Sequence, residues 1–279
     1  MTKTQFKKFE ILREEFKKKI EEWKTKYPEH KDDFVYNIAL DRITEKNNIK
    51  LIIVGDNPGK DEKEKGEYFV GKTGKMCRTF FTKALEGEGV KDFDKNVIVL
   101  NKTPISTAKT LDLADETKFS KEMVAETQRW MAELTANLCE TFKLDAFIIG
   151  SSLFAPGKLF EPFARSLKEN FNRLDSKFIL VFKHFSYGHF IKDWENMKNH
   201  FRKYEKKLEL YGYKSEEDKQ EFVFDTVDSD EEDDTQIIDD AGKFWMTAKC
   251  SDAYCDYTLE LLEKLGKGNY DATIRKYYP

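Results

Sequence analysis

The stretch LIIVGDNPGKDEKEKGEYFVGKTGKMCRTFF, residues 51–81, decides the fold. It opens with five residues that include two isoleucines and a valine, which predicts a strand buried on both faces of a parallel sheet. The strand runs into GDNPG (55–59), where two glycines and a proline predict a rigid turn. That turn presents Asp56 and Asn57 beyond the carboxyl end of the strand, where ligands bind in open parallel sheets.

Short apolar runs of the same kind recur along the chain, with helical stretches between them. Alternation of strand and helix predicts a three-layer α/β/α sandwich around a four-stranded parallel sheet, with right-handed crossovers. The further strands are expected at 97–101, 146–150 and 178–182, and the helices at about 74–86, 120–142, 157–171 and 191–209.

Both ends of the chain lie outside this alternation. Residues 1–47 predict two helices that pack on the body: an apolar stripe from Phe6 to Trp23, ended by Pro28, and a second helix over roughly 32–46. The body is expected to span 48–210. Residues 211–279 read as an acidic linker and a C-terminal segment with one helix at about 252–265, which either docks on the body or forms a separate interaction segment.

Composition excludes several classes of protein. Of the 279 residues, 36% are charged, and no run of about 18 apolar residues or secretory leader is present, so we expect no membrane contact. Four cysteines in a chain of this length do not make a disulfide framework. We therefore expect an intracellular protein, cytoplasmic (at the nucleoid) or nuclear, and a monomer.

The net charge of −4 hides an uneven distribution. Residues 211–279 carry eight basic and 18 acidic residues, a charge of −10, which leaves +6 on residues 1–210. A mildly basic body fits nucleic-acid binding, and the acidic segment is a candidate site for a protein partner. A soluble, highly charged surface explains the same numbers, so charge alone leaves both interpretations open.

Two sequence patterns suggest chemistry that their context does not support. GEYFVGKT (66–73) matches a Walker A motif literally, but a charged segment, not a strand, precedes it. Cys250 and Cys255 have no histidine or second cysteine pair close by, so we interpret them as free thiols and not zinc ligands. Cys77 and Cys139 are predicted to be core residues on helices.

Polar residues also follow two of the other predicted strands. Asn101 ends the second strand, and His184 follows the fourth. A lone histidine is more often structural than functional. His184 is predicted to be functional because it, Asn57 and Asn101 follow three parallel strands whose carboxyl ends meet at one edge of the sheet.

Four motifs in this order resemble the uracil-DNA glycosylase superfamily over about residues 48–200: GDNPG (55–59), YFVGKTG (68–74), LN (100–101) and HFS (184–186). The resemblance lies between the iron–sulfur branch and the mismatch-specific and single-strand-selective branches. Phe185 and Tyr68 stand where the pattern has proline. The iron–sulfur branch has cysteines ahead of the first strand, whereas here none precedes Cys77, so we expect no cluster.

The resemblance implies an enzyme of base excision repair. It would flip uracil, or a related deaminated base, out of DNA and hydrolyse the N-glycosidic bond, with no metal or organic cofactor. The alternative is a catalytically silent protein of the same fold that binds nucleic acid or a nucleotide.

The resemblance also implies a role for each candidate residue. Asn57 positions the attacking water, and His184 donates to the leaving base. Asp56, or the backbone N–H groups around it, helps to hold the base or the water. Phe69 stacks on the base and Asn101 binds its Watson–Crick edge. Phosphate contacts are assigned to Ser186, Lys60, Lys72, Lys102 and Lys183. The space that the flipped base leaves in the DNA stack would be filled by Tyr187, His189 or Phe190.

Overall fold

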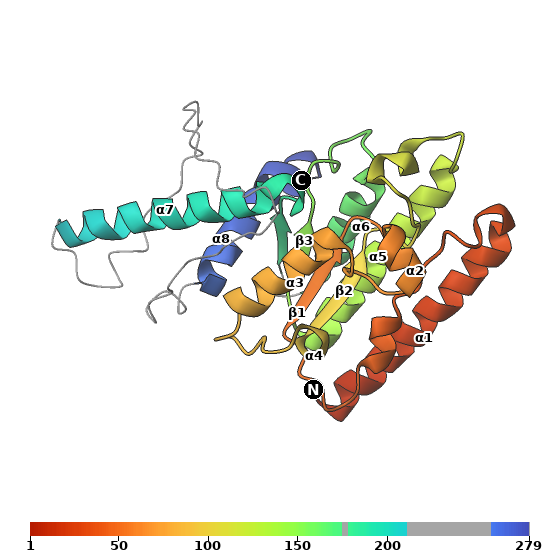
Figure 1. Ribbon diagram of the computed structural model, residues 1–279, viewed down its shortest axis with the longest axis horizontal. Coiled ribbons are helices and arrows are strands. Elements are labelled where there is room, and N and C mark those ends of the chain that lie inside the picture. Colours follow the sequence, from red (N-terminus) through yellow and green to blue (C-terminus); the bar gives the residue numbers. More distant parts are fainter. Residues whose placement is uncertain (175–177, 211–257, 279) are drawn as a thin grey trace.

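A four-stranded parallel sheet forms the centre of the protein (Figure 1). The computed structural model describes residues 1–174, 178–210 and 258–278. The strands run in the order β2-β1-β3-β4, and the three-layer sandwich predicted from the sequence is confirmed. Their bounds are β1 Leu51–Gly55, β2 Val97–Asn101, β3 Ala146–Ile149 and β4 Ile179–Phe182.

Every residue of the four strands is buried, because helices cover both faces of the sheet. Successive side chains point to opposite faces, so each strand contributes to two cores. In β1, for example, Ile52 and Val54 belong to one core, and Leu51 and Ile53 to the other.

The helices divide between the two cores. The first core is covered by α1 (Lys3–Lys26), α5 (Lys121–Phe142) and α6 (Glu161–Phe171), and the second by α3 (Lys72–Ala84), α7 (His189–Leu210) and α8 (Thr258–Tyr270). The short helices are α2 (Lys60–Lys65) and α4 (Phe93–Asn96). Figure 1 shows α1 lying along α5 at the outside of the first layer.

The predicted helix over 32–46 is wrong. Phe34 instead makes an isolated antiparallel bridge with Ile105, and only Ile38–Arg42 forms a short 3₁₀ helix. This segment crosses the edge of the sheet, where Asn37 donates to the carbonyl of Val99 and accepts from the amide of Tyr68. A regular helix would keep its backbone groups to itself and could not serve both cores, as Phe34 and Val35 do.

The C-terminal helix α8 docks on the sheet. Its Leu262 is fully buried in the second core, and a Cβ at Gly266 would lie 2.7 Å from Cβ of Leu180 in β4. Beyond α8, a turn of π-helix at Asp271–Arg275 leads to Tyr278, whose hydroxyl donates to the carbonyl of Phe154 at 2.6 Å. The acidic run at 225–240, Cys250 and Cys255 lie outside the described residues.

The strand order fixes where a ligand can bind. The chain leaves β1 through α3 on one face to reach β2, and returns through α5 on the other face to reach β3 on the opposite side of β1. The loop after β1 leads to α3 on one face and the loop after β3 leads to α6 on the other, so the two loops diverge and open a crevice at the carboxyl edge. Among the described residues, no helix combines the length and the apolar character needed to cross a membrane.

The docking of the C-terminal segment predicts unequal effects at two adjacent tyrosines. Tyr278→Phe leaves the buried carbonyl of Phe154 without its donor, so we expect the free energy of unfolding to fall by about 1–3 kcal/mol. Tyr277 is 37% exposed, and Tyr277→Phe should change it by less than about 0.5 kcal/mol. Urea unfolding measures both, and equal effects would contradict the docked position.

Candidate active site

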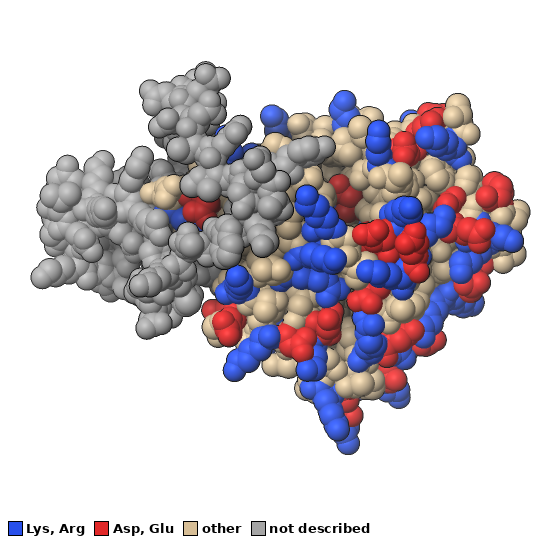
Figure 2. All heavy atoms as spheres, in the orientation of Figure 1, with Lys and Arg blue, Asp and Glu red and all other residues tan. Residues whose placement is uncertain are grey.

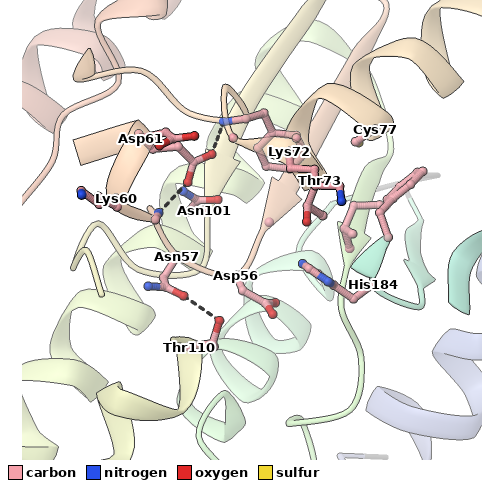
Figure 3. Close-up of a pocket in the computed structure, with 18 of the residues that line it drawn as sticks. Asp56, Asn57, Lys60, Asp61, Lys72, Thr73, Cys77, Asn101, Thr110 and His184 are labelled. Carbon is pink, nitrogen blue, oxygen red and sulfur yellow. Dashed lines mark hydrogen bonds between the residues drawn. The ribbon is translucent and has the colours of Figure 1, made fainter. Parts of the chain in front are cut away.

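A pocket of about 340 Å³ opens at the carboxyl edge of the sheet (Figure 3). Its size falls in the range of small-molecule sites, about 300–1,000 Å³. It brings together seven residues singled out from the sequence: Asp56, Asn57, Lys60, Phe69, Lys72, Asn101 and His184.

Phe69 forms an apolar wall of the pocket in a strained backbone conformation. Its φ of 59° lies in the left-handed region, which is uncommon for a bulky residue. The surroundings hold it there: Glu62 accepts its N–H, and Arg78 Nε donates to its carbonyl at 2.9 Å. A Cβ at Gly74 would lie 2.3 Å from the carbonyl carbon of Phe69, so α3 packs directly on this backbone. The backbone that carries the ring is therefore held in place, and the ring itself packs closely on Gly55.

Asn101 supplies an unused hydrogen-bond donor. Its side chain is 1% exposed, and Nδ2 has no partner among the described residues. A buried amide without a partner costs about 1–3 kcal/mol, so its presence in a pocket points to a ligand that completes it. Register pairing with Gly55 places Asn101 at the same level as the end of β1.

His184 lies on the opposite side of the pocket as a neutral donor. Its Nδ1 accepts the backbone N–H of Ser186 at 3.1 Å, so the proton of the neutral ring is on Nε2. The Ser186 hydroxyl also contacts Nδ1, at 2.6 Å. Burial lowers the pKa of His184 from its usual value of 6.5, which keeps the ring uncharged at neutral pH.

Lys102 does not face solvent, and its prediction as a phosphate contact is wrong. The side chain is completely buried, and its ammonium binds the Asp56 carboxylate and the carbonyl of Ile149, the latter at 2.6 Å. The ammonium also faces the rings of Phe154 and Phe160, with Nζ 5.3 and 4.9 Å from their centroids. Burial lowers the pKa of Lys102, and Asp56 opposes that effect.

Asn57 is tied to the loop that follows β2. Its Nδ2 donates to Thr107 Oγ1 at 2.8 Å and lies 3.3 Å from the carbonyl of Ile105, and its Oδ1 accepts from Thr110 at 2.9 Å (Figure 3). These bonds fix the loop over one side of the pocket. They also leave Oδ1 as the part of the amide with capacity for a further bond.

The remaining basic candidates surround the opening unevenly. Lys60 and Lys72 are exposed and line the pocket, with Lys72 at the first position of α3. Lys183 is exposed and pairs with Asp193 at 2.8 Å. Figure 2 shows basic side chains gathered near the middle of one face, interspersed with acidic ones.

Of the residues expected to fill the space that a flipped base leaves in the stack, Phe190 is buried, so that prediction is wrong for Phe190. The side chain of Tyr187 lies outside the described residues.

Sequence reasoning missed several residues of the pocket. Glu62 bridges the turn and the aromatic wall, because its carboxylate accepts the N–H of Gly59 at 2.7 Å as well as that of Phe69. Its position three residues after Gly59 is the spacing of a helix capping box, which could have revealed it. Thr107 and Thr110 had no comparable signal. Also missed were Asp61, Thr73, Cys77, Ala108, Ile149 and Phe185.

The described cysteines do not fit a shared cluster. Cys77 on α3 and Cys139 on α5 are buried in different cores, on opposite faces of the sheet, as predicted for core residues. Among the described residues, no group of three or more histidine, cysteine or acidic side chains could hold a metal ion.

The fold and the pocket define a class: an α/β protein with an aromatic wall, a buried amide and a neutral imidazole converging at the carboxyl edge of its sheet. The sequence pattern of the Uracil DNA glycosylase superfamily matches residues 43–209, and the chain belongs to this superfamily. A comparison with curated proteins gives no match. Membership points to a DNA-glycosylase type of function and to DNA as the binding partner.

The packing of α3 against Phe69 can be tested with two helical glycines. Alanine is ordinarily about 1 kcal/mol better than glycine inside a helix. Gly268 in α8 has open space around it, so Gly268→Ala should raise the free energy of unfolding by up to about that amount. Gly74→Ala should lower it by roughly 1–3 kcal/mol, because the methyl group collides with the Phe69 backbone. Urea unfolding decides, and a gain at both sites would refute the close contact.

Proposed function

We propose that the protein removes uracil, or a related deaminated base, from DNA by hydrolysing the N-glycosidic bond. The observation that carries the proposal is the unpartnered, buried Nδ2 of Asn101, in one pocket with the ring of Phe69 and the neutral donor of His184. Superfamily membership supports the same type of reaction.

The pocket suits a flipped base. A base extruded from the duplex leaves its neighbours and needs a new stacking surface, which the fixed ring of Phe69 provides. Uracil presents an acceptor at O4 and a donor at N3. The amide of Asn101 answers both, with Nδ2 to O4 and Oδ1 to N3–H.

His184 stabilises the leaving group. When the N-glycosidic bond breaks, its electron pair goes to the base, and negative charge develops on the base oxygen. Nε2–H of the neutral imidazole donates to that oxygen, and the Ser186 amide fixes the orientation of the ring.

The polar pair after β1 binds the attacking water at the sugar carbon. Asn57 has little capacity left for further hydrogen bonds, because its amide already bonds to residues of the loop after β2. Asp56 lines the pocket, and its ion pair with Lys102 uses only one carboxylate oxygen, Oδ1. The second oxygen of Asp56 is left to accept a hydrogen bond from water. Lys60, Lys72, Lys183 and Ser186 remain the proposed contacts to DNA phosphates.

The first test measures excision directly. Single-turnover incubation with single- and double-stranded oligonucleotides that contain one uracil, followed by alkali, should give strand breaks at that position. A gel shift without breaks in either substrate would instead support the alternative, a nucleic-acid-binding protein without catalysis.

Asn101→Asp tests how the base is read. A carboxylate facing O4 is mismatched, so we expect uracil excision to fall about ten- to a hundredfold, the equivalent of roughly 1–3 kcal/mol. Cytosine, with a donor at N4, should become a weak substrate, more so at lower pH where the carboxyl group also donates to N3. Undiminished uracil excision would mean that Asn101 does not contact the base.

His184 should set the acid limb of the pH profile. Because burial lowers its pKa below 6.5, the active neutral form persists as pH falls to 6.5, and the rate should drop only below that value. His184→Ala should lose roughly 10²–10³ in rate and also lose this limb. If the variant melts earlier while its folded fraction keeps the wild-type rate, the histidine is structural.

A further inference from the structure

An ion pair between the fully buried Lys102 and the half-buried Asp56 lies at the wall of the pocket. Lys102 follows β2 and Asp56 follows β1, and their backbones are also joined, since the Lys102 amide donates to the carbonyls of Gly55 and Asp56 at 2.9 and 3.1 Å. The ammonium has no route to solvent, and its donors are directed at Asp56, the Ile149 carbonyl and two aromatic faces. Such a pair contributes little stability compared with apolar residues of the same volume, which raises the question of what else it does.

The pair faces His184. Figure 3 shows the Asp56 carboxylate and the His184 imidazole directed toward one another at the pocket wall. The charged or titratable groups that act on His184 are Asp56 after β1, Lys102 after β2 and His189 on its own side of the pocket. Asp56 raises the pKa of His184, whereas Lys102 and His189 lower it. A carboxylate beside a histidine ordinarily favours the imidazolium form, and here the ammonium behind that carboxylate opposes it.

We propose that Lys102 is a positioning residue: it fixes the Asp56 carboxylate at the pocket wall and offsets its charge, so that His184 meets the departing base as a neutral donor. This inference rests on the proposed function and adds to it a residue outside the pocket lining. It explains how one site holds a carboxylate for water and an uncharged imidazole side by side. The aromatic rings of Phe154 and Phe160 cover the ammonium of Lys102 and keep water from screening its charge.

The proposal is tested by the titration of His184 in the free protein, followed by NMR. The chain has four histidines, and the His184 signal is identified by its loss in His184→Gln. In Lys102→Met the Asp56 charge is no longer offset, so we expect the His184 midpoint to rise, on the order of one pH unit. The acid limb of uracil excision should move to higher pH by the same amount.

A matched control separates this effect from a general loss of positive charge. Lys109 is exposed, lies on the loop near the pocket, and does not contact Asp56. Lys109→Met removes one positive charge and should leave the His184 midpoint near the wild-type value, because solvent and salt screen exposed charges. A midpoint that rises equally in both variants overturns the proposal, as does one that stays unchanged in Lys102→Met.

Lys102→Met leaves the half-buried Asp56 carboxylate without its ammonium partner, and the variant can fail to fold for that reason alone. Asp56→Asn then provides the test, because loss of the carboxylate should lower the His184 midpoint, and an unchanged or higher midpoint overturns the proposal. In the double variant, Asp56→Asn with Lys102→Met, the midpoint should return toward that of the wild type.

The titration and the activity assay fail independently. A wild-type protein that excises no uracil, but whose His184 midpoint rises in Lys102→Met, loses the proposed function and keeps the electrostatic coupling. An active protein whose midpoint does not respond to either substitution loses only the role of Lys102.

Discussion

The pairing of β1 between β2 and β3 is the constraint on which the rest of the structure depends. Gly55 is in register with Asn101, and Val54 with Ile148, so the three carboxyl ends stop at nearly the same level. Parallel strands must return by crossovers, and the two directions of crossover separate the loops at this edge. Residues far apart in the sequence, such as Asp56, Asn101 and His184, are thereby brought to one pocket. A shift of one position in register would turn each side chain to the opposite face.

Strong local patterns made most of the fold predictable, and long-range bonds explain why the helix predicted over 32–46 does not form. The apolar runs at 51–55 and 97–101 gave the bounds of β1 and β2, because a strand buried on both faces must be continuously apolar. The helix predicted at about 120–142 likewise agrees with α5 to within a residue at each end. The segment 32–46 carries helical spacing, yet its backbone groups bond to distant parts of the chain: the amides of Val35 and Ile38 donate to the carbonyls of Pro104 and Gly66, and the carbonyl of Val35 accepts from the Tyr68 hydroxyl. Such long-range bonds leave no periodic trace in a sequence.

The site was predictable where a residue follows a strand directly. Asn101 and His184 needed only the strand ends and the rule about carboxyl edges. Lys102 also follows a strand, but successive residues there alternate between the pocket and the core, and nothing in LNK distinguishes a lysine that turns inward to Asp56. Thr107 and Thr110 reach the pocket through their bonds to Asn57, and the sequence does not encode those bonds locally. The residues missed are thus those positioned by contacts that only the folded chain creates.

The docking of α8 on β4 has a consequence for how the protein is made. Leu180 and Phe182 find their cover in Leu262 and Leu265, and residues 211–257 must be synthesised in between. A nascent chain that has emerged only as far as α7 therefore displays an uncovered apolar strip on an otherwise assembled sheet, a surface that chaperones bind. Completion of the fold is coupled to translation through residue 278. Premature termination anywhere in the acidic stretch would leave this strip uncovered and expose the truncated protein to aggregation and proteolysis, even though every residue of the pocket had already been made.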